Sequence, residues 1–76
     1  MAAKAFVLIE TAVGKTKDVT TALGQIKGMK SVDAVTGPYD VIAIIEAETL
    51  SDIGDIVTEK IHPTTGISRT VTCLAI

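Results

Sequence analysis

Two short aliphatic runs constrain this chain more than any other feature: AFVLI at residues 5–9 and VIAII at residues 41–45. Successive side chains of an extended strand point to opposite faces, so each run is apolar on both faces. A strand of an antiparallel sheet with one solvated face alternates apolar and polar residues instead. We therefore expect both runs to lie in a sheet that is covered on one face by helices and on the other by a partner.

Helical periodicity follows each of these runs. The first helix is expected from about Lys17 to Gly28, with Thr16 as its N-cap and Val19, Leu23 and Ile26 on its apolar side. The second is expected from the N-cap Thr49 to Pro63, which cannot continue a helix. Its apolar stripe consists of Leu50, Ile53, Val57 and Ile61. The isolated glycines Gly24 and Gly54 are interpreted as close-packing points against the sheet.

Strands are expected over residues 5–13, 31–36, 41–46 and 67–75. The resulting order, β-α-β-β-α-β, predicts an α+β, ferredoxin-like fold with a four-stranded antiparallel sheet and both helices on one face. Weak similarity between the two halves, such as VLIE and AIIE, supports this architecture. Residues 1–76 are expected to form one domain.

Composition narrows the range of partners. Seven Lys and Arg residues and nine Asp and Glu residues give a net charge of −2, and the lysines are scattered, which argues against direct nucleic acid binding. No apolar run approaches the roughly 18 residues that would cross a membrane. A chain of this size buries only about 60% of its unfolded surface. Because 47% of the residues are hydrophobic, we expect a dimer formed through the uncovered sheet face.

Few residues are suited to catalysis or metal binding. His62 is the only histidine, and we interpret it as a polar loop residue or a cation at a helix C-terminus. Cys73 is the only cysteine and is interpreted as a buried structural thiol. A single cysteine cannot form an internal disulfide, and the apolar core near the N-terminus is too short for a secretory signal, so a cytoplasmic location is expected. No cofactor is expected.

The sequence TGPYD at residues 36–40 links the two middle strands. Gly37 and Pro38 supply the turn, but a turn does not require Tyr39 or the carboxylate of Asp40. The last strand carries hydroxyls at Ser68, Thr70 and Thr72, with a period of two that places them on one face. These hydroxyls either reflect strand propensity or, together with Asp40 and the turn, bind a small zwitterion.

The stretch VDAVTGPYDVIA from Val32 to Ala43 and the stretch GISRTVTC from Gly66 resemble the RAM domain, the effector-binding half of the leucine-responsive and asparagine-responsive (Lrp/AsnC) regulators. The resemblance covers essentially the whole chain but not the helix-turn-helix half of those regulators. It implies binding of free amino acids, dimerisation through the sheets and assembly of dimers into rings, with effector pockets between dimers. The implied ligand-binding residues are Gly37, Tyr39, Asp40, Thr70 and Thr72.

The preferred hypothesis is therefore an amino-acid-binding regulatory module, not an enzyme, which acts on transcription with a full-length regulator as a possible partner. The alternative is a small dimeric α/β-barrel enzyme, such as a cofactor-free monooxygenase or isomerase. That alternative needs a cavity lined by aromatic residues or histidine, and the chain has only Phe6, Tyr39 and His62. A third possibility, an ACT-type regulatory domain, pairs its sheets side by side and would leave the apolar face uncovered.

Overall fold

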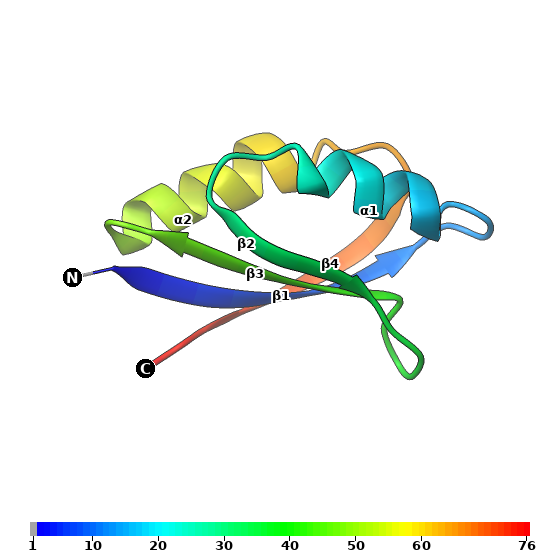
Figure 1. The fold of residues 1–76 in the computed structure, drawn as a ribbon, viewed down its shortest axis with the longest axis horizontal. Coiled ribbons are helices and arrows are strands. Elements are labelled where there is room, and N and C mark those ends of the chain that lie inside the picture. Colours follow the sequence, from blue (N-terminus) through cyan, green and yellow to red (C-terminus); the bar gives the residue numbers. More distant parts are fainter. Residues whose placement is uncertain (1) are drawn as a thin grey trace.

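The computed structural model describes residues 2–76 and contains one four-stranded antiparallel sheet with two helical segments on one face (Figure 1). In chain order the elements are β1 (Ala3–Thr11), α1 (Thr16–Gly24), β2 (Met29–Ala34), β3 (Val41–Ala47), α2 (Leu50–Ile56), a π-helical turn η1 (Val57–Ile61) that continues α2, and β4 (Ile67–Leu74). The strands lie in the order β2-β3-β1-β4, so β1 and β3 are central and β2 and β4 form the edges. The predicted ferredoxin-like fold is confirmed.

The core lies between the sheet and the helices. Alternate residues of the two central strands are fully buried there. These residues are Ala5, Val7 and Ile9 of β1 and Val41, Ala43 and Ile45 of β3. From the helices, Val19 and Leu23 of α1 and Ile53 of α2 pack onto them. The two-faced aliphatic runs therefore place one of their faces in the core, as their period of two predicts.

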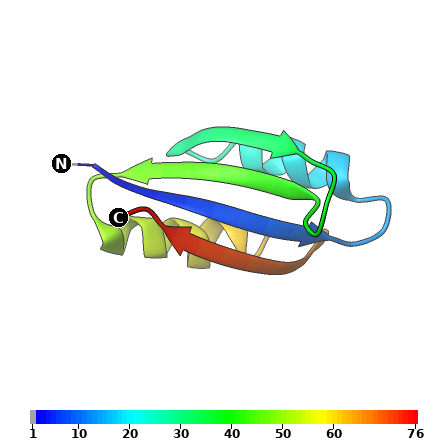
Figure 2. The same cartoon turned by 90° about the horizontal axis from the view of Figure 1, so that it is seen from below.

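The other face of the sheet is covered by no described element, as Figure 2 shows from below. We call it the open sheet face. The register of the strands brings six apolar side chains together on it: Phe6, Leu8, Ile42, Ile44, Val71 and Cys73. Cys73 is exposed, so its predicted burial is wrong for the single chain. The reason is the alternation of β4, which places Cys73 opposite Phe6 on the open sheet face.

Helix α1 differs from its predicted bounds at both ends. Thr16 is the first helical residue, not the N-cap, and its Oγ1 forms a hydrogen bond of 2.8 Å with Thr11 Oγ1. The helix ends at Gly24, four residues before the predicted stop. Gly28 instead adopts a positive φ of 99° where the chain enters β2. A Cβ atom at Gly24 would have no neighbour within 4 Å, so Gly24 is not a close-packing point.

Helix α2 begins as predicted and ends differently. Thr49 Oγ1 accepts a hydrogen bond of 3.0 Å from the Asp52 N–H, which is N-cap geometry. The π turn η1 follows, with the His62 N–H donating to the Val57 carbonyl over 2.9 Å. Ile53, Val57 and Ile61 are four residues apart, whereas an α-helix has 3.6 residues per turn, so in a regular helix their side chains would turn progressively away from one face. The π turn has more residues per turn and offsets this rotation. Val57 and Ile61 therefore both face the core.

Leu50, by contrast, is 59% exposed, although it belongs to the predicted apolar stripe. It lies in the first turn of α2, on the side of the helix that faces the edge strand β4. Among residues 2–76, no helix is long and apolar enough to cross a membrane.

The cap of α2 provides a test of the fold. Replacing Thr49 with alanine removes the acceptor for the Asp52 N–H, and we expect the free energy of unfolding to fall by about 1 kcal/mol. Thr49→Ser retains the hydroxyl and is the control, with stability close to that of the wild type. Urea unfolding followed by circular dichroism measures both variants, and equal losses in the two would contradict the cap.

Candidate functional site

The loop between β2 and β3 is fastened to the end of β1 by Asp40. Its carboxylate Oδ2 accepts a hydrogen bond of 2.8 Å from the Thr11 N–H. Its backbone N–H donates to the Ile9 carbonyl, and its carbonyl accepts from the Val35 N–H, both over 2.9 Å. Asp40 thus connects the loop to β1 and closes the β2–β3 hairpin. The register shift of the β1–β4 pairing between Glu10 and Thr11 lies at the same point.

The other two loop residues implied by the resemblance lie beside Asp40. Gly37 is exposed and has a φ of 141°. Residues other than glycine rarely adopt this backbone conformation. Tyr39 is half-buried. The loop bends away from the helices, toward the side of the open sheet face (Figure 1). Gly37 therefore has a conformational role, and Tyr39 and Asp40 lie at the end of the sheet where β1 finishes.

The hydroxyls of β4 lie on the helix side of the sheet. Thr70 is paired with Ile9 and Thr72 with Val7, and both partners are core residues. Opposed residues of an antiparallel pair share a face, so the two threonines face the helical layer. Ser68 is different, because its hydroxyl donates to the Glu10 carbonyl over 3.1 Å. The predicted row of hydroxyls is thus reduced to Thr70 and Thr72.

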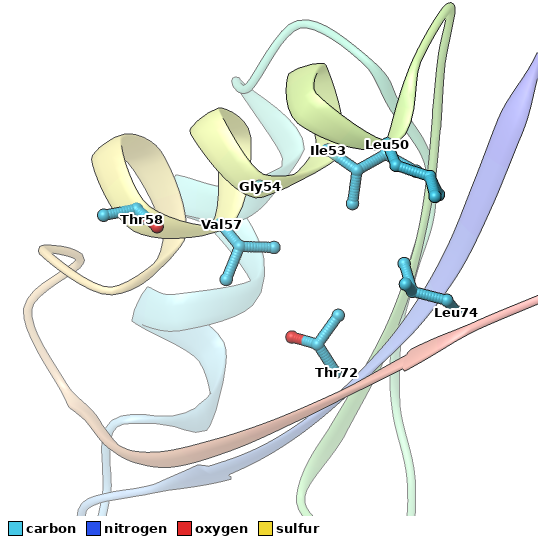
Figure 3. Close-up of a pocket in the computed structure, with 7 residues that line it drawn as sticks. All are labelled: Leu50, Ile53, Gly54, Val57, Thr58, Thr72 and Leu74. Atoms are coloured by element: carbon cyan, nitrogen blue, oxygen red, sulfur yellow. The ribbon is translucent and has the colours of Figure 1, made fainter.

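An open pocket of about 310 Å³ lies between α2 and the edge strand β4 (Figure 3). It is lined by Leu50, Ile53, Gly54, Val57, Thr58, Thr72 and Leu74. The pocket is aliphatic apart from the two threonine hydroxyls, and its lining contains no histidine, carboxylate or aromatic ring. Its volume is at the lower end of the range, roughly 300 to 1,000 Å³, of small-molecule sites.

The structure does not gather the five implied residues in one chain. Thr72 lines the pocket, whereas Gly37, Tyr39, Asp40 and Thr70 do not. The β2–β3 loop, which carries the first three, bends to the side of the sheet away from the helices (Figure 1), whereas Thr72 lies on the helix side. The pocket of the single chain therefore includes only one of the five, and the set of five stays a prediction.

Of the seven residues that line the pocket, sequence reasoning named only Thr72 as a ligand residue. Thr58 has the appearance of an ordinary exposed helix residue, and nothing in the pattern singles it out. Gly54 was assigned to close packing, but a Cβ atom there would have no neighbour within 4 Å. A glycine within a helix that does not pack closely could have been a signal for an open space beside it.

The other polar residues that the structure describes form one ion pair and no metal-binding cluster. Arg69 and Glu10 make an ion pair of 3.3 Å on the open sheet face. Exposed pairs of this kind contribute about 0 to 1 kcal/mol. Among residues 2–76, no three His, Cys, Asp or Glu side chains lie close enough together to hold a metal ion.

The contacts of Asp40 predict a role in stability. Asp40→Ala removes the acceptor of the Thr11 N–H, and we expect the free energy of unfolding to fall by about 1 to 2 kcal/mol. Asp40→Asn keeps a side-chain oxygen at the same position and should lose less than half of that. Thermal and urea unfolding of the two variants measures the difference. Wild-type stability in Asp40→Ala would show that this hydrogen bond does not fasten the loop.

Known proteins resemble this chain both in sequence and in structure. Among curated proteins, an uncharacterised helix-turn-helix transcriptional regulator of Pyrococcus furiosus is 32% identical over 59 residues, which are 78% of this chain and 39% of the regulator. A homocitrate synthase of Saccharolobus islandicus is 33% identical over 61 residues, 80% of this chain and 13% of the enzyme. The chain thus spans well under half the length of these relatives.

Solved structures share the fold. The crystal structure of FFRP-DM1 matches with 38% identity and a TM-score of 0.92, covering 97% of this chain and 99% of that one. A transcriptional regulator of Neisseria meningitidis, solved as a complex with L-Met, matches with a TM-score of 0.86 over 97% of this chain and 49% of the regulator. Its 12% identity establishes the fold alone. The family model of the Lrp/AsnC ligand binding domain matches residues 4–76, and the chain therefore belongs to the Lrp/AsnC ligand-binding domain family.

Proposed function

We propose that this chain is a sensor module that binds a free amino acid, dimerises through its open sheet face and acts on transcription through a full-length Lrp/AsnC regulator. The observation that carries the proposal is an open, mostly aliphatic pocket with two hydroxyls in a domain of a ligand-binding family. Small-molecule sites have this composition, with apolar walls and a few polar groups that orient the ligand. The Neisseria regulator provides an example of this fold in complex with an amino acid.

The relatives support a module that responds to a ligand. A DNA-binding regulator and a homocitrate synthase both contain a segment similar to this chain, as 39% and 13% of their lengths. Neither DNA binding nor the synthase reaction is common to both proteins. Binding of a small effector is a function that such a segment would supply equally well to a regulator and to an enzyme of metabolism.

The open sheet face supports dimerisation. Its six apolar side chains are flanked by charged ones: Lys4 lies opposite Glu46, and Arg69 pairs with Glu10. The Lys4 ammonium also lies 5.2 Å from the centre of the Phe6 ring. An apolar centre with a polar rim is the usual composition of a protein interface. A second copy presents the same surface, which suits a two-fold dimer.

The β2–β3 loop supports a ligand site shared between protomers. One oxygen of Asp40 bonds to Thr11, and Oδ1 accepts no hydrogen bond from residues 2–76. That oxygen can accept a hydrogen bond from the ammonium group of an amino acid. The loop reaches the end of the sheet, where it can meet another protomer. Asp40 would then have two roles, one in stability and one in binding.

The dimer predicts different outcomes at two neighbouring positions of β3. Ile44→Glu places a charge on the open sheet face, so we expect a folded monomer. Ala43→Glu buries an unpaired charge in the core and should prevent folding. Thr65→Glu, at an exposed loop position, is the charge control. Sedimentation and circular dichroism separate these outcomes, and a monomeric wild type would contradict the dimer.

Amino acid binding is tested by calorimetry of the wild type against the standard amino acids, with native mass spectrometry to follow assembly. We expect Asp40→Asn to weaken binding by about 1.5 to 3 kcal/mol, on the order of tenfold or more, because the amide has no charge for the ligand ammonium. Thr20→Ala, remote from loop and pocket, is the control. Unchanged affinity in Asp40→Asn would remove Asp40 from the ligand site, and no binding of any amino acid would refute the function.

A further inference from the structure

The two edges of the sheet differ in how well they are protected against pairing with another strand (Figure 2). Edge strand β2 has only six residues, and its pairing with β3 shifts register between Met29 and Ser31. It also carries two exposed charged residues, Lys30 and Asp33. Short length, a bulge and charged side chains are the devices that prevent an edge strand from pairing with a second chain. The β2 edge is therefore unsuited to such a contact.

Edge strand β4 lacks most of these devices. It has eight residues, and its sequence ISRTVTCL contains no proline or lysine. Its one charged residue, Arg69, is paired with Glu10 of the neighbouring strand β1 at 3.3 Å. The register shift against β1 affects only the start of β4, and the pairing is regular from Arg69 to Leu74. An edge of this length with so little charge accepts another strand readily.

The backbone of β4 presents hydrogen-bonding groups along this edge. The Ala75 N–H donates to the Lys4 carbonyl of β1 over 2.9 Å. Alternate residues of an antiparallel strand direct their N–H and C=O groups to opposite sides of the strand. Thr70, Thr72 and Leu74 therefore direct theirs away from β1, to the edge of the sheet. These groups have no ladder partner in a single chain, and a further strand can bond to them.

The open sheet face is apolar up to the β4 edge but not up to the β2 edge. Next to β2 the face ends in Ser31 and Asp33, which lie opposite residues of β3 that belong to the face. Next to β4 it ends in Val71 and Cys73, which lie opposite Leu8 and Phe6 of β1. A strand added at β4 continues this apolar surface, whereas one added at β2 does not.

The β4 strand is complementary to a second copy of itself. In an antiparallel pair with its two-fold axis at Val71, Thr70 lies opposite Thr72 of the other copy, and their outward N–H and C=O groups meet. Cross-strand pairs of β-branched residues and of threonines stabilise a sheet. Arg69 then lies opposite Cys73, so no like charges face each other. A second copy of this chain therefore fits the edge, and the contact is two-fold symmetric.

We propose that the edge of β4 is a second self-association surface, at which β4 of one chain pairs antiparallel with β4 of another. The pairing joins two four-stranded sheets side by side and makes their open faces into one larger apolar surface. It rests on the dimer of the proposed function, because that larger surface is covered by the sheets of two further copies. Two of the dimers formed through the open sheet face thus associate along their β4 edges.

The edge contact depends on the dimer for a physical reason. A single two-stranded pairing is marginal in water, so it does not hold two isolated chains together. When two dimers lie side by side, the edge contact forms twice, once in each sheet layer. A chain that cannot dimerise through its open face, such as Ile44→Glu, is therefore still expected to be a monomer.

The first experiment removes one outward N–H. Thr70→Pro deletes a donor that faces the edge and not β1, and proline is tolerated in edge strands where the N–H faces solvent. We expect the wild type to sediment as two associated dimers and Thr70→Pro as one dimer, a twofold loss of mass. Thr70→Val keeps the N–H and is the control, with the mass of the wild type. A wild-type mass in Thr70→Pro would overturn the edge contact.

Hydrogen exchange tests the same contact in the unmodified chain, independently of how the proline variant folds. In the wild type we expect the N–H groups of Thr70, Thr72 and Leu74 to exchange about tenfold or more slowly than in the monomeric Ile44→Glu. The N–H of Cys73 faces β1, is protected in both proteins and serves as the internal control. Exchange of the three outward groups at equal rates in both proteins would show that the edge is not paired.

The outcomes separate this inference from the proposed function. A wild type that is one dimer, with fast exchange at Thr70 and Leu74, overturns the edge contact and leaves the dimer standing. A larger assembly that Thr70→Pro does not reduce also overturns the edge contact alone. A monomeric wild type overturns both the edge contact and the dimer.

Discussion

Strands β1 and β3 occupy the middle of the sheet and carry aliphatic side chains on both faces, while the chain has helices for only one of them. The helix side is closed by Leu23, Ile53 and Ile61, among others, and forms the core. The other side leaves Phe6 and its neighbours in contact with solvent in a single chain. Exposure of an apolar surface to water is unfavourable. The same sequence pattern that builds the core therefore also favours association through the open sheet face.

Asp40 serves the fold and, in the proposed function, would also serve the ligand site. It bonds to β1 through its carboxylate and its N–H, and to β2 through its carbonyl. These bonds fasten the β2–β3 loop to the end of the sheet. If the proposed ligand binds there, a loop held in this way would present Tyr39 and the second carboxylate oxygen in a defined position, which would lower the entropy lost on binding.

The pocket exists because the helical layer does not cover the sheet evenly. Helix α2 packs on the central strands β1 and β3, and the edge strand β4 lies beyond it. Gly54 lines the resulting space, and the π turn η1 begins at its wall with Val57 and Thr58. Departures from regular helix geometry of this kind are frequent at functional sites. Thr72 enters the pocket from β4 because it shares a face with the core residue Val7.

The sequence by itself determined the order of elements, the two apolar faces of the central strands and the cap at Thr49, because these depend on local periodicity and capping chemistry. It also indicated TGPYD as the hairpin link. Only the tertiary structure decided that Cys73 is exposed, that Asp40 bonds to Thr11 and that Gly54 borders a pocket. Each of these depends on pairing between segments far apart in the chain, and a single-residue register change would move a strand residue to the other face.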